Sequence, residues 1–270
     1  MMGATTQSKP VGNLLREWRV RRRMSQLALA CESNISTRHL SFLETGRSQP
    51  SRDMVLHLAE QLEIPLRERN VLLTAAGYAP VFQERNLEDP ALQSARKAIE
   101  LVLKGHEPYP AIAIDRHWTL VASNKAIAPM LAGVDSSLLS PPVNVLRLSL
   151  HPYGLAPRIA NFSQWRAHIL ERLRRQIDIT ADAVLLGLFK EISKYPVPKG
   201  SLLHKADAKN EYAGIIVPLQ LRTEQGVLTF ISTTTIFGTP VDVTLSELAI
   251  ESFFPADAET AEMMRRIVER

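Results

Sequence analysis

The apolar positions of the first 77 residues recur with the spacing of helices. Residues 11–24 place Leu14, Leu15 and Trp18 on one stripe, followed by a run of arginines at positions 19 and 21–23. Another helix begins after Ser51, a candidate N-cap, and its apolar positions are Met54, Val55, Leu58, Ala59 and Leu62. Pro65 separates it from a helix over residues 66–76 that stops at Gly77. With two more helices in residues 25–47, the pattern predicts a compact all-α domain of five short helices.

Residues 25–47, SQLALACESNISTRHLSFLETGR, predict two short helices joined by a tight turn, the second over residues 36–45 and closed by Gly46. This is the outline of a helix-turn-helix, whose second helix enters the DNA major groove. On that helix Leu40 and Leu43 face inward, and the opposite arc, which can meet base edges, consists of Thr37, Arg38, Ser41, Phe42 and Thr45. Taken alone, the helix also fits an ordinary amphipathic surface helix.

The order and spacing of SQxxLA, ISxxxLSxLExGR and the following Pro50-Ser51 resemble the XRE helix-turn-helix of phage repressors and Cro, over roughly residues 10–77. The resemblance implies a lambda-repressor-like fold and a structural ion pair between Glu44 and Arg19. It also implies DNA contacts by position. The side chain at the start of the second helix is Gln26, the base-reading positions hold Thr37, Arg38 and Phe42, and the positions that meet phosphates or the groove edge hold Ser36, His39, Ser41 and Arg47.

One position departs from the family pattern. Phage repressors often have a polar residue where this chain has Phe42. The aromatic ring either contacts a thymine methyl group or folds back onto the protein.

Charge is distributed unevenly along the chain. Residues 1–80 hold 11 basic and 7 acidic side chains, whereas residues 81–270 hold 21 of each, so the net charge of +4 lies in the first part. This suits a polyanionic partner for the first domain and a neutral role for the second. An excess of this size is also common in soluble proteins.

Several features bear on the cellular compartment. Cys31 is the only cysteine, so no disulfide forms within the chain, and we expect it to be a small core residue. The first ten residues, MMGATTQSKP, lack the apolar core of a signal peptide. No stretch approaches the run of about 18 apolar residues that a membrane span requires. We therefore expect a cytoplasmic protein with no membrane partner.

The length of 270 residues leaves room for two domains, and the pattern changes after Pro80. We expect a DNA-binding domain over residues 1–80, a polar linker over 81–92 and a second domain over 93–270. Asp89-Pro90 opens a helix that Gly105 ends, and apolar runs at 111–114 and 119–122 predict a β-hairpin. Asn124 is expected to cap a short helix that ends at Leu131.

Further elements follow in the second domain. The pattern predicts helices over residues 142–151, 159–176 and 181–194, strands over 215–221 and 227–237, and a closing helix over 257–270. This order indicates an α+β domain with an antiparallel sheet and helices on one side of it.

Three phrases carry a second resemblance: HEPYPAIAIDRHWTLVASN, NVLRLSLHP, and the N-terminal TRHLSFLETGRSQPSRDMVLHLAEQLEIPLRERNVLLTAAGYAP. They resemble the MmyB-like regulators over nearly the whole chain. The resemblance implies a PAS-like sensor domain with a largely apolar pocket, which in the family is thought to accept a fatty-acid-like ligand. These motifs are more specific for the family than for the ligand.

The residues themselves suggest candidate ligand contacts. Asn144, Arg147 and His151 share one face of a predicted helix, where Arg147 and His151 can bind a carboxylate and Asn144 can add a hydrogen bond. A polar surface face, or a buried network that holds the helix to the sheet, is the alternative. Asn124 can also hydrogen-bond a ligand. Trp118 and Phe230 lie on predicted strands or their edges. Their side chains either form part of the wall of a ligand site or belong to the core.

An enzyme is not indicated. The chain has no G-x-G-x-x-G, Walker loop or G-x-S-x-G motif, and its seven histidines lack the spacing of a metal site, so we expect no catalytic residue, metal or cofactor. The leading hypothesis is a transcription regulator that binds a near-palindromic operator as a homodimer and responds to a small apolar ligand. In the alternative, the second domain only mediates dimerisation or protein interaction. A DNA-tethered enzyme is a third hypothesis.

Overall fold

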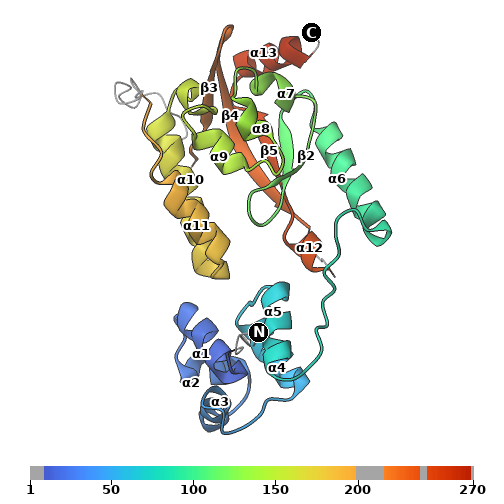
Figure 1. Cartoon of the computed structure of the whole chain (residues 1–270), viewed down its shortest axis with the longest axis vertical. Helices are drawn as coiled ribbons and strands as arrows, with labels where there is room; N and C mark the ends of the chain where they lie inside the picture. The colour runs from blue at the N-terminus through green and yellow to red at the C-terminus, as the bar shows by residue number, and fades with distance from the viewer. Residues whose placement is uncertain (1–8, 199–215, 238–241, 269–270) are drawn as a thin grey trace, which may run out of the picture. The chain divides into compact units, whose positions relative to one another are not determined.

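The computed structural model describes residues 9–198, 216–237 and 242–268. These residues form two compact units, one consisting mainly of the chain up to Arg85 and the other mainly of the chain from Asn86 onward (Figure 1). The first unit is a bundle of five helices, and the second is an antiparallel sheet with helices. The expected fold class, an all-α unit followed by a PAS-like α+β unit, is confirmed. None of the helices in the described ranges has the length and apolar character needed to cross a membrane.

Serine side chains start three helices of the first unit. Its helices are α1 (Val11–Arg21), α2 (Gln26–Glu32), α3 (Thr37–Glu44), α4 (Arg52–Gln61) and α5 (Leu66–Ala75). The hydroxyl groups of Ser25, Ser36 and Ser51 each accept a hydrogen bond from the backbone N–H three residues later, at 3.0, 3.1 and 3.2 Å. Such caps satisfy N–H groups that have no partner inside the helix. The predicted N-cap at Ser51 is confirmed.

The inward faces of these helices meet in one apolar core. Its fully buried side chains include Leu15, Leu29, Leu40, Leu43, Leu58 and Leu72. The expectation that Cys31 fills this core is wrong, because its side chain is exposed. Cys31 lies one turn after Leu27, which is 63% exposed, so both lie on the outer face of α2.

Gly12 allows α1 to lie directly against the end of α3. A Cβ atom at this position would stand 2.3 Å from the carbonyl oxygen of Leu43 and 2.8 Å from that of Glu44. Both atoms belong to the backbone, so they cannot move aside as a flexible side chain would. The close approach of the two helices therefore requires glycine here.

The second unit is built on a five-stranded sheet. Its strands are β1 (Ala111–Ile114), β2 (Leu120–Ser123), β3 (Leu219–Thr223), β4 (Gly226–Ile236) and β5 (Ala249–Pro255). They lie in the order β2-β1-β5-β4-β3, and every neighbouring pair is antiparallel. The predicted β1–β2 hairpin and the turn between β3 and β4 are confirmed; residue 215, at the start of the predicted third strand, lies outside the described residues.

Helices cover both faces of this sheet, so the expectation of helices on one side is wrong. The helical elements are η1 (Pro90–Leu92), α6 (Gln93–Gly105), α7 (Ile127–Met130), α8 (Ser136–Leu139), α9 (Val145–Leu150), η2 (Ala156–Arg158), α10 (Phe162–Thr180), α11 (Ala183–Ile192), α12 (Val243–Ser246) and α13 (Ala258–Val268). Ala111 and Ala113 of β1 pack with α6, while Ile112 and Ile114 pack in the cluster that holds α9, α10 and α11. In Figure 1, α6 lies on one side of the sheet, and α9, α10 and α11 lie on the other. Because all four residues of β1 are buried, the strand lacks the alternation of a half-exposed strand.

The central strand β5 was not predicted, because a charged residue interrupts its apolar pattern. Glu251 is only 3% exposed. Its carboxylate pairs with the guanidinium of Arg172 on α10, and it accepts a hydrogen bond from the hydroxyl of Thr234 on β4 at 2.8 Å. A charge is tolerated at the middle of the sheet because α10 supplies the opposite charge.

The expected linker begins as part of the first unit. The side-chain oxygen of Asn70 on α5 accepts hydrogen bonds from the backbone N–H groups of Val81 and Phe82, and its amide group donates to the carbonyl oxygen of Phe82 at 2.7 Å. Arg69 also lies over the ring of Phe82. Residues 81 and 82 are therefore held on α5 rather than free.

We predict that Gly12→Ala destabilises the first unit. In an open helix, alanine is favoured over glycine by about 1 kcal/mol. At this site the added methyl group has to push α1 away from α3, which costs about 1–3 kcal/mol. Urea denaturation measures the effect, with Asn13→Ala, an exposed neighbour on α1, as the control. An unchanged or higher free energy of unfolding for Gly12→Ala would contradict the close approach.

Candidate nucleic-acid interface and ligand-binding core

The outer arc of α3 is accessible over its length. Arg38 and Thr45 are exposed, and Thr37, Ser41 and Phe42 are half-buried, while Leu40 and Leu43 are buried on the opposite side. The other positions predicted to face DNA are also accessible: Ser36 and Arg47 are exposed, and Gln26 and His39 are half-buried. The helix thus offers one continuous polar and basic strip.

A buried ion pair fixes the position of α3. The carboxylate of Glu44 accepts hydrogen bonds from Nε of Arg19 at 2.6 Å and Nη2 of Arg19 at 2.9 Å. Gln26 donates to the same carboxylate at 2.7 Å, so α1, α2 and α3 meet at one group. The hydrogen bonds to Glu44 raise the pKa of Arg19, against the opposing effect of its burial. The predicted pair between Glu44 and Arg19 is confirmed, and Gln26 carries a structural contact besides its predicted DNA contact.

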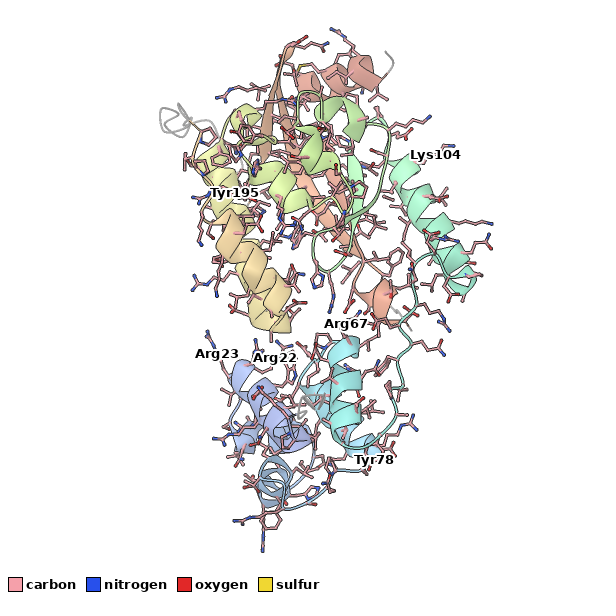
Figure 2. The ribbon with its side chains drawn as sticks, in the orientation of Figure 1. Arg22, Arg23, Arg67, Tyr78, Lys104 and Tyr195 are labelled. Atoms are coloured by element: carbon pink, nitrogen blue, oxygen red, sulfur yellow. The ribbon has the colours of Figure 1, made fainter. Side chains whose placement is uncertain are left out.

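The basic run at the end of α1 is partly structural. Arg19 serves Glu44, and Arg22 donates to the carbonyl oxygens of Leu62 and Glu63 at 2.8 and 2.9 Å, where α4 ends. Figure 2 labels Arg22 and Arg23 beyond the end of α1. Arg19 and Arg22 therefore stabilise the helix bundle, so part of the excess positive charge of this unit has a structural role.

Two arginine guanidinium groups lie near the ring of Phe42. The Cζ atom of Arg38 is 5.3 Å from the centre of the Phe42 ring, and that of Arg47 is 5.8 Å away. Both distances fall within the range of cation–π interactions. The ring thus contacts two exposed arginines, and it keeps part of its own surface accessible.

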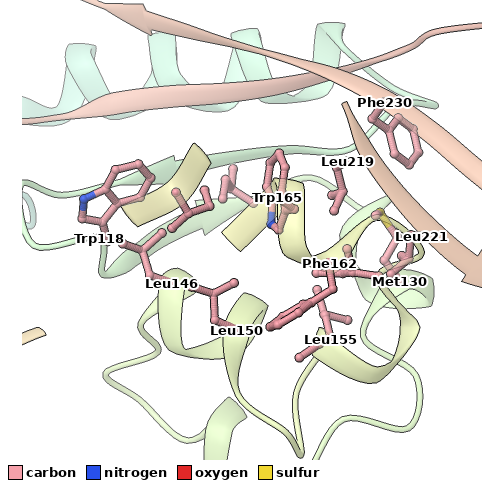
Figure 3. Close-up of a cluster of buried hydrophobic side chains, with 14 of the residues drawn as sticks. Trp118, Met130, Leu146, Leu150, Leu155, Phe162, Trp165, Leu219, Leu221 and Phe230 are labelled. Atoms are coloured by element: carbon pink, nitrogen blue, oxygen red, sulfur yellow. The ribbon is translucent and has the colours of Figure 1, made fainter. Parts of the chain in front are cut away.

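Trp118 and Phe230 belong to the main apolar cluster of the second unit (Figure 3). Phe230 is fully buried, and Trp118 is 5% exposed. The indole N–H of Trp118 donates to Gln176 on α10 at 2.8 Å, and the guanidinium of Arg172 lies 4.6 Å from its ring. Trp118 also has a φ angle of +65°, a left-handed conformation rare for a bulky residue. The β1–β2 turn is therefore held firmly against α10.

Asn124 does not cap the short helix, so this expectation is wrong. Its side-chain oxygen accepts from the N–H of Ala111 at 3.1 Å, and its amide donates to the carbonyl oxygens of Leu103 and Tyr109. It is 6% exposed, and α7 begins without a side-chain cap. The polar groups of Asn124 are used to join α6 to β1, which leaves little capacity for a ligand.

Asn144, Arg147 and His151 take part in contacts between protein groups. Asn144 caps α9 and donates to the carbonyl oxygen of His117 at 2.8 Å. Arg147 forms two hydrogen bonds, of 2.8 and 2.7 Å, with the carboxylate of Glu191 on α11. The carboxylate bound to Arg147 in this structure is therefore one of the protein's own, and a ligand contact of Arg147 stays a prediction.

An aromatic ring completes this group of contacts. The hydroxyl of Tyr195 donates to Glu191 at 2.6 Å, and the ring of His151 stands edge-on to Tyr195, with 5.0 Å between the ring centres. Burial, followed by the hydrogen bond to Glu191, raises the pKa of Tyr195 to about 12. The network joins α9 to α11. Because the side chains of Arg147 and Glu191 are 44% and 39% exposed, it lies at the surface, and it holds α9 to a helix and not to the sheet.

The structure brings only some of the predicted ligand residues together. Trp118 and Asn144 lie next to each other, since the N–H of Val145 donates to the carbonyl oxygen of Trp118, whereas Asn124 lies near α6. Glu251 was not singled out from the sequence, because only the fold brings it to its partner Arg172. Within the described ranges, no group of three or more His, Cys, Asp or Glu side chains is placed to bind a metal ion.

Comparison with protein families follows the same division of the chain. Residues 15–69 match a family described as helix-turn-helix, and residues 95–267 match the family described as MmyB-like transcription regulator ligand binding domain. The second match spans more than half of the 270 residues. Neither description names an enzyme. No curated protein matches the chain.

We predict that Glu44→Gln strongly destabilises the first unit. The substitution removes the charge that balances the buried Arg19, and breaking such a pair costs about 3–5 kcal/mol. Urea denaturation measures the loss. Glu17→Gln is the matched control, because the pair of Glu17 with Lys9 is exposed and its loss should cost at most about 1 kcal/mol. Equal effects of the two substitutions would contradict a structural role for Glu44.

Proposed function

We infer the function from the family to which this chain belongs, that of the MmyB-like transcription regulator ligand binding domain. We propose that the chain binds a specific operator as a homodimer. A small apolar ligand changes its affinity for that operator. Its place among DNA-binding transcription regulators with a ligand-binding domain is the premise. The operator, the dimer and the ligand class are the proposal.

The observation that carries the DNA-binding proposal is the pair of guanidinium groups on and beside α3. Arg38 and Arg47 are exposed, and within the described ranges neither forms an ion pair. Arginine can form two hydrogen bonds with O6 and N7 of guanine in the major groove. Arg38, in the first turn of α3, is suited to a base, and Arg47, after the helix, is suited to a phosphate.

A homodimer follows from how helix-turn-helix proteins read DNA. Two copies related by a twofold axis contact half-sites about one helical turn apart, roughly 34 Å. The operator is therefore near-palindromic. Regulation requires a ligand that binds more tightly to one arrangement of the dimer than to the other.

The ligand proposal rests on the apolar interior of the second unit and on its family. The cluster around Trp118, Phe162 and Phe230 is continuous, and it is lined by α9, α10 and the sheet (Figure 3). An apolar chain would find side chains of matching character there. We propose a fatty-acid-like molecule as the ligand.

We predict that Arg38→Ala weakens binding to a duplex enriched from a randomised pool by the wild-type protein. Loss of a two-bond contact to guanine should cost about 1–3 kcal/mol on this duplex, and less on random DNA. Fluorescence anisotropy at fixed salt measures both affinities. Arg16→Ala, which removes an exposed arginine from α1, is the control for charge alone. Equal losses on both duplexes would mean that Arg38 contacts phosphate, not a base.

We predict that the protein purified from its host without refolding carries a bound long-chain acid. Native mass spectrometry would record a dimer with one such mass for each chain. Adding the same acid to stripped protein should raise the melting temperature, because a ligand that binds only the folded state stabilises it by about 2.7 kcal/mol at 100 times its dissociation constant. A ligand-free dimer whose melting temperature is unchanged by a panel of fatty acids would favour an interaction module.

A further inference from the structure

We propose that Phe42 is a positioning residue that holds the guanidinium groups of Arg38 and Arg47 ready for DNA as one pair. The inference rests on the proposed DNA-binding function and adds to it a residue that determines affinity without itself reading a base. It differs from the thymine-methyl contact that the sequence left open.

The first observation is the shared ring. Arg38 precedes Phe42 by one helical turn on α3, so the two side chains lie on the same face of the helix. Arg47 comes from the turn after α3, yet its Cζ atom is 5.8 Å from the same ring centre, compared with 5.3 Å for Arg38. One aromatic side chain thus brings together two cations from different segments.

The second observation is that the backbone of Phe42 anchors the same turn. Its carbonyl oxygen accepts hydrogen bonds from the N–H of Arg47 at 2.8 Å and the N–H of Ser48 at 3.1 Å. Gly46, with a φ angle of +74°, makes this reversal possible. Phe42 therefore positions two parts of Arg47. Its carbonyl oxygen holds the Arg47 backbone by a hydrogen bond, and its ring lies near the Arg47 guanidinium.

The third observation concerns what remains available for DNA. A guanidinium that lies against an aromatic ring uses its face and keeps the N–H groups at its edge for hydrogen bonds. Both arginines are exposed, and in the described part of the chain no carboxylate pairs with either of them. Restricting the two long side chains before binding lowers the ordering cost that each would otherwise add to association.

The positive charges of Arg38 and Arg47 explain why this arrangement favours DNA. Two guanidinium groups near one ring repel each other, and each is attracted to the negative face of the ring. A phosphate beside a base edge would relieve that repulsion. The ring holds each cation near one side chain in the free protein, and DNA supplies the negative charge that completes the group.

Double-mutant cycles test the inference on the duplex enriched by the wild-type protein. Phe42→Leu keeps an apolar side chain and removes the ring, and it should weaken binding about 4- to 25-fold, corresponding to about 2- to 5-fold for each arginine. In an Arg38→Gln or Arg47→Gln background, the effect of Phe42→Leu should shrink by about 2- to 5-fold. Phe42→Tyr keeps the ring and should stay within about 2-fold of wild type.

Controls separate this role from a structural one and from direct readout. Thermal denaturation is recorded for each variant, and Phe42→Met replaces Phe42→Leu if the latter melts earlier. A second duplex carries uracil in place of each thymine, which removes the methyl groups. The wild-type protein and Phe42→Leu should lose affinity for the uracil duplex by the same factor.

The inference would be overturned if the fold-loss in DNA affinity of each double variant equalled the product of the losses of its two single variants, because Phe42 would then not be coupled to either arginine. A uracil effect that disappears in Phe42→Leu would also overturn it, in favour of a thymine contact. Failure of the wild-type protein to enrich or bind any duplex would overturn the proposed DNA-binding function itself.

Discussion

The carboxylate of Glu44 is buried at the end of α3, where a charge without a partner would be strongly destabilising. Arg19 neutralises it from α1, and Gln26 adds a hydrogen bond from α2. These contacts can form together only when the three helices hold one relative orientation. The exposed arc of α3 and its arginines follow from that orientation, and Gly12 permits it by letting α1 approach the α3 backbone.

The second unit uses the same principle in its sheet. Glu251 places a buried carboxylate on the central strand β5, and Arg172 of α10 neutralises it while covering the ring of Trp118. The helix, the strand and the β1–β2 turn are thus joined at the edge of the apolar cluster. A ligand that displaces side chains of this cluster would shift α10, β5 and the β1–β2 turn together, because a close-packed interior transmits small shifts.

What could be predicted from the sequence depended on short-range signals. The cap at Ser51, the arc of α3 and the hairpin of β1 and β2 are each encoded within a few residues. The pair of Glu44 with Arg19 came from family resemblance. Strand β5 was missed because Glu251 interrupts its apolar pattern. The interior bonds of Asn124 and the Arg147–Glu191 pair could not be predicted, because their partners lie on distant segments that only the fold brings near. Cys31 was misplaced because a seven-residue helix such as α2 carries too few apolar positions to define its inner face.

The central claim is that two copies of α3 read two half-sites of one operator. Methylation protection of guanine N7, carried out with the full-length protein on the enriched duplex, tests it most directly. The account predicts two protected groups of guanines in the major groove, related by symmetry and about one helical turn apart. A single protected group, or protection spread evenly along the duplex, would contradict it.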